Sequence, residues 1–215
     1  MGERIIEIDE RGVRGFLHEA AGENGLVLTH SAGANCRSPL LVTLADAFCG
    51  VGVTVLRYDL PFRQERPKGP PLRSAERDQQ GVALAVEWMK GKVRGRVFAG
   101  GHSYGGRQTS MMAATSPEMA QGLLLLSYPL HPPNRPTQMR TGHFPEWQTP
   151  ALFVQGARDG FGTQDEMREA LQLIPAATRL LMVDGAGHEL LTKANHGALT
   201  QAILSEFREL FLARW

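Results

Sequence analysis

The residues of this 215-residue sequence with the clearest chemical potential lie at 97–106, where an apolar run leads into Gly-His-Ser-Tyr-Gly around Ser103. This pattern is typical of a sharp turn from a strand into a helix, which holds a serine hydroxyl above the end of a sheet. Gly101 and Gly105 let the strand and the helix approach closely. Ser103 is therefore a candidate nucleophile. The Tyr104 N–H, at the start of the helix, is a candidate donor to an oxyanion.

A serine hydroxyl is a weak nucleophile at neutral pH, so it needs a histidine base and an acid that orients the histidine. In folds with this turn, the acid and then the histidine follow the serine along the chain. Asp159 comes shortly after the apolar run at 152–156, and His188 lies in a glycine-rich loop after the last apolar run. Asp165 falls inside a predicted helix, and Asp184 is too close to the last strand to reach His188. We therefore assign the acid to Asp159.

A second N–H donor to an oxyanion is expected in the loop at residues 30–35, after the third predicted strand. Small residues there let the backbone approach a substrate. We assign the donor to Ala32 and keep Ser31 as the alternative. Four side chains are candidate walls of a shallow pocket built from loops: Ser31, Phe62, His131 and Phe161.

The other histidines are weaker candidates for catalysis. His131 has two interpretations, a hydrogen bond that stabilises its loop or a contact with a polar group of the substrate or with Arg140. His102 directly precedes Ser103 and is expected to point away from it. The remaining three are expected to be structural or solvated: His18, His143 and His196.

Strand and helix patterns alternate from residue 25 onward, which predicts a largely parallel sheet with helices on both faces. Two early strands joined around residues 10–12 predict an antiparallel hairpin at the sheet edge. The other predicted strands cover residues 25–30, 53–58, 97–100, 122–127, 151–155 and 179–183. The predicted helices cover residues 38–48, 74–90, 107–114, 163–173 and 195–212.

The connections complete this architecture. The proline-rich segments 60–73 and 128–149 are predicted to be loops. Ser74 is the predicted N-cap of its helix. The last helix is predicted to bury one apolar face made of Leu199, Ile203, Phe207 and Leu210. Eight strands in one domain spanning residues 1–215, without an insertion large enough for a cap domain, fit the α/β-hydrolase fold.

Composition narrows the classes of partner and compartment. A net charge of +1 provides no field that would attract nucleic acid or an anionic membrane. Cys36 and Cys49 do not make a disulfide framework and are expected to be reduced thiols. The first residues lack a signal-peptide pattern, and no apolar run is long enough to span a membrane. These features predict a cytoplasmic protein.

No cofactor is assigned from the sequence. The glycines around Ser103 lack the lysine of a phosphate-binding loop and do not fit the dinucleotide fingerprint. The histidines are too far apart in sequence for a local metal motif. We therefore expect neither a cofactor nor a metal, and the sequence leaves the oligomeric state open.

Three further stretches carry a family resemblance, which covers nearly the whole chain from His30 onward. They are Val-Leu-Arg-Tyr-Asp-Leu-Pro-Phe at 55–62, Ser-Tyr-Pro-Leu-His-Pro-Pro at 127–133 and Gln-Gly-Ala-Arg-Asp-Gly-Phe-Gly at 155–162. With these, the chain resembles the small α/β-hydrolases of the dienelactone hydrolase-like group. That group includes the hydrolase-like domains of a testis-expressed protein and of a histone-acetyltransferase-complex subunit.

The resemblance implies that Ser103, Asp159 and His188 form a catalytic triad, in agreement with their spacing. The chain departs from the family pattern at two places. Ser31 follows His30 where a glycine is common, and the nucleophile is a serine where dienelactone hydrolase has a cysteine. Lactone chemistry therefore does not carry over.

These observations lead to one principal hypothesis about function. A serine hydrolase would cleave a small carboxylic ester or thioester through an acyl-enzyme, with Ser103, His188 and Asp159 as its triad. The first alternative is a protein-interaction module that kept the fold and lost useful turnover. The second is an acyltransferase or peptidase that uses the same triad.

Overall fold

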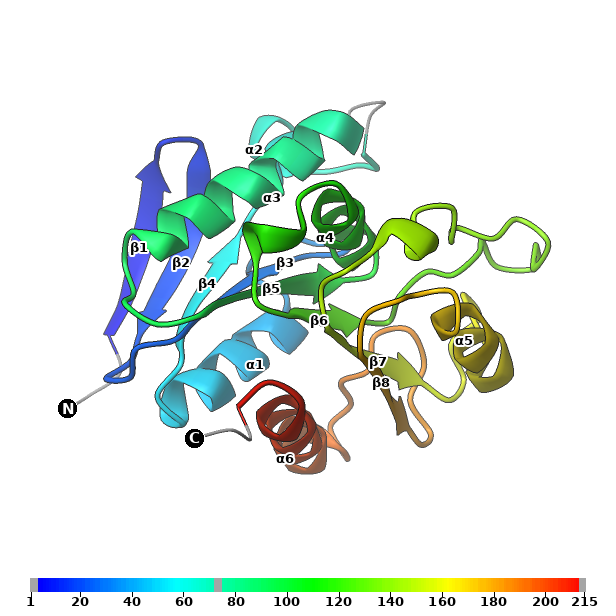
Figure 1. Cartoon of the computed structure of the whole chain (residues 1–215). Coiled ribbons are helices and arrows are strands. Elements are labelled where there is room, and N and C mark those ends of the chain that lie inside the picture. Colours follow the sequence, from blue (N-terminus) through cyan, green and yellow to red (C-terminus); the bar gives the residue numbers. More distant parts are fainter. Residues whose placement is uncertain (1–3, 72–74, 213–215) are drawn as a thin grey trace.

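A computed structural model of the chain describes residues 4–71 and 75–212 and contains one eight-stranded sheet (Figure 1). The strand order is β1-β2-β4-β3-β5-β6-β7-β8. β1 pairs with β2, and β2 with β4, in antiparallel fashion, while every other pair is parallel. The strand bounds are β1 Arg4–Glu10, β2 Val13–Glu19, β3 Gly25–Thr29, β4 Thr54–Tyr58, β5 Val97–His102, β6 Leu123–Leu126, β7 Ala151–Gly156 and β8 Thr178–Val183.

Helices cover both faces of the sheet, as the alternating pattern predicts (Figure 1). On one face, α1 and α6 pack over a core of leucines and phenylalanines that includes Phe98, Phe48 and Phe207. On the other face, α3 and α4 cover a second apolar cluster, which includes Trp147. The helix bounds are α1 Pro39–Gly50, α2 Pro61–Glu65, α3 Ala75–Lys90, α4 Tyr104–Thr115, α5 Gln164–Leu171 and α6 His196–Phe207. Short 3₁₀ turns lie at η1 Pro117–Met119 and η2 Phe144–Glu146.

The central strands are buried on both faces, which explains their unbroken apolar sequences. All residues of β3, β5, β6 and β7 are buried. Strands of this kind need helices above and below them, because burial on both faces leaves no solvent-facing positions. The described residues form the α/β-hydrolase fold, and no cap domain is evident among them.

The prediction of a loop at residues 60–73 is wrong for its first part, which forms α2. Pro61 occupies a first-turn position, where its fixed φ angle favours a helix and its missing N–H costs nothing. Phe62 and Arg63 are both buried, although the segment reads as polar and irregular. The predicted N-cap, Ser74, lies outside the described residues.

Two other helices differ from their predicted bounds. The helix after Ser103 begins at Tyr104 rather than at Arg107, because the Gly-Gly pair belongs to its first turn. The C-terminal helix changes to a π-helical segment, η3 Arg208–Leu212. This change in winding buries Phe211, while Leu210 stays only half-buried. The predicted positions Leu199, Ile203 and Phe207 are buried.

Among the residues that the structure describes, no helix has both the length and the apolar character needed to cross a bilayer.

The close pairing of β5 with β6 gives a testable prediction at Gly100. A Cβ at this position would overlap the carbonyl oxygen of Leu124 on β6, and a backbone oxygen cannot move aside cheaply. We expect Gly100→Ala to lower the free energy of unfolding by about 3 kcal/mol, the upper part of the overpacking range. Urea denaturation measures this change. Gly197→Ala is the control, because Gly197 lies in α6 with nothing within 4 Å of a new Cβ. Equal stabilities of the two variants would contradict the prediction.

Candidate active site

Ser103 lies at the turn between β5 and α4 and adopts a backbone conformation that L-residues rarely use. Its φ is 51° and its ψ is −113°. Such a conformation persists only where the surroundings impose it. The Ser103 N–H donates to the carbonyl of Leu126 at the end of β6, 2.8 Å away. A Cβ on Gly101 would lie 2.7 Å from the Thr29 carbonyl oxygen, and one on Gly105 would lie 2.5 Å from that of His30. The glycines therefore let β3, β5 and α4 close around the serine.

The structure brings Ser103, His188 and Asp159 together in one hydrogen-bonded chain. The Ser103 Oγ lies 2.8 Å from His188 Nε2. The Nδ1 atom of the same ring lies 2.9 and 3.0 Å from the two carboxylate oxygens of Asp159. The Asp159 side chain is fully buried, whereas the His188 side chain is 22% exposed. In this arrangement Nδ1–H donates to the carboxylate, and Nε2 is free to accept the serine proton.

Gln155, Phe161 and His102 hold the triad in place through contacts that the sequence analysis did not predict. Phe161 was expected there only as a wall of the pocket. The Gln155 amide donates to Asp159 Oδ2 at 2.9 Å, and the Phe161 N–H donates to Asp159 Oδ1 at the same distance. The Phe161 ring stacks on His188 with 4.2 Å between centroids. His102 Nε2 lies 2.8 Å from the His188 carbonyl oxygen, which makes it the donor. The aspartate and the histidine are thus fixed from both sides.

His102 is structural rather than solvated. It is 1% exposed, and burial is the largest cause of its lowered pKa. A neutral ring still keeps one N–H to donate to His188. Gln155 is a polar residue in a strand that is otherwise apolar, which indicates in the sequence that its side chain has a buried hydrogen-bond partner. In the structure that partner is Asp159.

The loop after β3 is held by a buried histidine. His30 Nε2 accepts from the Leu60 N–H at 3.2 Å, so its Nδ1–H donates to the Ser31 carbonyl at 2.8 Å. Burial lowers the pKa of His30 to about 4, which keeps the ring neutral. A planar trans peptide directs its N–H opposite to its C=O. The Ala32 N–H therefore points away from the His30 ring, and no acceptor for it is found within residues 4–71 and 75–212.

Arg63 fixes the same loop from the other side. Its buried guanidinium donates to the carbonyl oxygens of Ala32 and Ala34, at 2.7 and 2.8 Å. It also donates to those of Arg66 and Gly69, both at 3.0 Å. The acceptors are all neutral carbonyls, so one cation ties α2 and the segment after it to the loop that contains Ala32.

Asp78 connects α3 to Tyr104. This fully buried carboxylate accepts the Tyr104 hydroxyl at 2.7 Å and the Phe62 N–H at 3.1 Å. Burial is the main cause of its raised pKa, and the two hydrogen bonds act in the opposite direction. The Phe62 and Tyr104 rings meet edge to face at 5.6 Å. Nothing in the sequence of this helix distinguishes Asp78 from a solvated charge, so sequence reasoning missed it.

The other predicted pocket residues occupy different positions. Phe62 is buried against His30 and Tyr104, and Ser31 is half-buried in its loop. His131 is buried, with Nδ1 2.8 Å from the Pro132 carbonyl and Nε2 3.3 Å from Glu166. These contacts match the loop-stabilising interpretation of His131, and no contact with Arg140 is found among the described side chains.

The three remaining histidines also have protein partners. His18 accepts from the Arg57 side chain at 2.9 Å. His143 Nε2 lies 2.9 Å from Ser110 Oγ, and His196 Nε2 lies 3.1 Å from the Thr43 hydroxyl. His18 is fully buried and so is not solvated.

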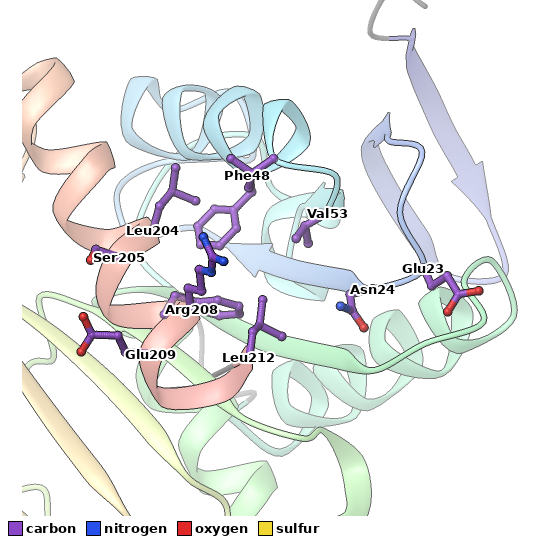
Figure 2. A pocket seen from close by; sticks show the side chains of 11 residues that line it. Glu23, Asn24, Phe48, Val53, Leu204, Ser205, Arg208, Glu209 and Leu212 are labelled. Carbon is purple, nitrogen blue, oxygen red and sulfur yellow. The ribbon is translucent and has the colours of Figure 1, made fainter. Parts of the chain in front are cut away.

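A cavity lies at the other end of the sheet from the triad. Its volume is about 860 Å³, and its lining includes Asn24 before β3, Phe48 at the end of α1, and Leu204 of α6 (Figure 2). Ser103 follows the carboxyl end of β5, whereas Asn24 precedes β3, so this cavity is remote from the triad. Within the described ranges, no three His, Cys, Asp or Glu side chains gather as metal ligands would.

Comparison with known structures identifies relatives of the same fold. A dienelactone hydrolase from Anabaena variabilis is 22% identical, with a TM-score of 0.74 over 98% of this chain and 97% of its own. Est1E from Butyrivibrio proteoclasticus is 14% identical, with a TM-score of 0.75 over 96% and 98%. An α/β serine hydrolase without a lid from Xanthomonas campestris is 17% identical, with a TM-score of 0.72 over 99% and 96%.

The match to a protein family extends over most of the sequence. The family described as alpha/beta hydrolase domain matches residues 22–213. The matched range includes the turn at Ser103, the aspartate loop and the histidine loop. The small size of the chain, its sheet order and its dienelactone hydrolase neighbour agree with the resemblance drawn from its motifs. The chain belongs to the alpha/beta hydrolase family.

Proposed function

We propose that this protein is a serine hydrolase that cleaves a small carboxylic ester or thioester through an acyl-enzyme. The observation that carries the proposal is the hydrogen-bonded chain from Ser103 through His188 to Asp159, with 2.8 Å between Ser103 Oγ and His188 Nε2. A hydroxyl at this distance from a neutral imidazole can transfer its proton as it attacks. Family membership supports hydrolytic chemistry, and the triad supports a serine mechanism.

The reaction has two halves. Ser103 Oγ attacks the carbonyl carbon while His188 Nε2 takes the hydroxyl proton, which gives a tetrahedral oxyanion. Collapse expels the alcohol or thiol, which receives that proton, and leaves the acyl group on Ser103. Water then attacks the acyl-enzyme, with His188 again as base, and releases the acid and the free serine. Asp159 keeps the imidazole oriented and stabilises its protonated form.

The oxyanion would be stabilised by two backbone donors, the N–H groups of Ala32 and Tyr104. Tyr104 is the first residue of α4, so its N–H has no partner within the helix. The Ala32 N–H points away from His30 and lacks an acceptor in the described part of the chain. His30, Arg63 and Asp78 are positioning residues in this proposal, because they act on the donors through other groups.

Labelling with a fluorophosphonate tests the nucleophile. We expect stoichiometric modification of purified protein at Ser103, located by mass spectrometry, because the probe reacts only with an activated serine. Ser103→Ala should abolish the label, and His188→Ala should slow ester turnover about 10³-fold or more. Circular dichroism of both variants is the folding control. A folded wild-type protein that takes no label would instead favour the interaction-module hypothesis, and acyl transfer to added alcohols would identify a transferase.

Arg63 provides a test of the oxyanion loop. We expect Arg63→Ala to lower kcat about 10- to 100-fold with little change in KM, because the donor at Ala32 is used in the transition state. Added guanidinium at millimolar concentration should restore part of kcat by occupying the vacated site. Arg66→Ala is the matched control, since its side chain is exposed and only its carbonyl accepts from Arg63. A change in KM with kcat unchanged would contradict this role, and so would the failure of guanidinium to restore kcat in a folded variant.

The neutral state of His30 predicts an acid-sensitive fold. Its pKa is about 4 in the folded chain and about 6.5 in the unfolded chain, so the unfolded chain binds more protons between these values. The stability from this ring is complete above about pH 6.5 and is lost as the pH falls toward 4. We expect a loss of about 3 kcal/mol over this window, measured by urea denaturation at stepped pH. His30→Gln, which keeps an acceptor, should flatten the profile, and parallel profiles would contradict the prediction.

A further inference from the structure

Two arginines near Ser103 have no acidic partner among the residues that the structure describes. Arg107 lies in the first turn of α4, and Arg140 lies in the long connection between β6 and β7. Both side chains are partly buried. Within residues 4–71 and 75–212, the buried Arg107 Nε atom has no hydrogen-bond partner, and Arg140 Nη1 reaches the Pro129 carbonyl alone, at 3.4 Å. Neither guanidinium pairs with a carboxylate among the residues that the structure describes, which distinguishes them from Arg179 with its two glutamates.

The charge of Arg107 acts on Arg140, His143 and Tyr128, so these four side chains lie near one another. Burial and then the charge of Arg107 lower the pKa of Arg140. Burial and then the same charge lower the pKa of His143 to about 4, so His143 is neutral. Burial raises the pKa of Tyr128 to about 12, so its hydroxyl is neutral as well. The region therefore holds two positive charges, and no negative charge is found there among the described groups.

Hydrogen bonds fix this region beside the nucleophile. The Arg107 N–H donates to the Ser103 carbonyl at 2.9 Å, so the Arg107 backbone lies one helical turn after the nucleophile. Side chains on a helix lean toward its N-terminus, which brings Arg107 toward Ser103. The Arg140 N–H donates to the Leu130 carbonyl at 2.7 Å, next to the end of β6 that binds the Ser103 N–H. Ser110 Oγ joins α4 to His143 in the same connection at 2.9 Å.

Partial burial of two like charges without a counter-ion is unfavourable in the free protein. An anion that enters between them would relieve the repulsion and would satisfy the orphaned Arg107 Nε. A planar guanidinium fork suits a carboxylate, which it binds through two parallel N–H···O contacts.

We propose that Arg107 and Arg140 form a subsite for a carboxylate of the substrate, beside the ester bond that Ser103 attacks. The inference rests on the proposed function and names the substrate class, small esters that carry a free acid. The subsite would orient the substrate by its charge, whereas the triad and the backbone donors act on the ester carbonyl.

Two matched pairs of esters test this subsite. In the first pair the acid is on the acyl side, mono-4-nitrophenyl adipate against its terminal amide. In the second the acid is on the leaving group, 4-acetoxybenzoate against 4-acetoxybenzamide. We expect kcat/KM to be about tenfold or more higher for the acid in at least one pair, since a hydrogen bond to a charged group is stronger than one to a neutral group. The pair that shows the preference identifies the side of the ester that carries the acid.

Variants assign the preference to the two arginines. Arg107→Met and Arg140→Met should each reduce the acid-to-amide ratio of kcat/KM toward one. Arg135→Met is the control, because Arg135 is exposed in the same connection, and it should keep the wild-type ratio. Where a Met variant fails to fold, Arg107→Lys or Arg140→Lys should lower the ratio in part, since lysine keeps the charge and loses the fork.

The outcomes separate this inference from the proposed function. Hydrolysis of both members of each pair at equal rates would overturn the carboxylate subsite and leave the serine hydrolase intact. An unchanged ratio in folded arginine variants, with only a lower melting temperature, would also overturn it. Cleavage of no ester, together with absent fluorophosphonate labelling, would reject the proposed function instead. In that case, stabilisation of wild-type protein by adipate that is lost in Arg140→Met would still support the anion site.

Discussion

The close approach of β3, β5 and α4 is the constraint on which the rest of the site depends. Glycines at 101 and 105 make the approach sterically possible, and Ser103 accepts a left-handed φ so that its hydroxyl projects from the turn. The same approach brings His30 against the first turn of α4. As a result, one packing contact places the serine, the start of the helix and the loop that contains Ala32 within a single small region.

Around this contact, buried polar side chains form hydrogen bonds with fixed protein groups in place of water. Arg63 donates to four carbonyl oxygens, Asp78 accepts from Phe62 and Tyr104, and His30 joins two backbone segments. Each of these groups would be costly to bury alone, but each finds its partners in loops or in the first turns of α2 and α4. Such loops have little apolar surface of their own, so hydrogen bonds rather than the core hold them over the sheet. The rigidity of the site is thus largely polar in origin.

The motifs of the sequence predicted the strands, the sheet type and the positions of Ser103, Asp159 and His188, because glycine turns and apolar runs act over short distances. The contacts of Asp78 and Arg63 were not predictable in the same way. Each depends on a partner distant in sequence, or on a buried environment that a polar residue type does not reveal. The helix at Pro61 was missed for a related reason. Pro61 favours the start of a helix, but the polar sequence of the segment does not show that Phe62 and Arg63 are buried.

The positive φ of Ser103 also bears on how the sequence can change over time. Glycine would adopt this backbone conformation without strain, so selection for stability alone would favour replacing the serine. Selection for turnover acts in the opposite direction at the same codon. A serine at this position, between glycines that relieve the close contacts of the turn, therefore carries a conformational cost that a glycine would avoid.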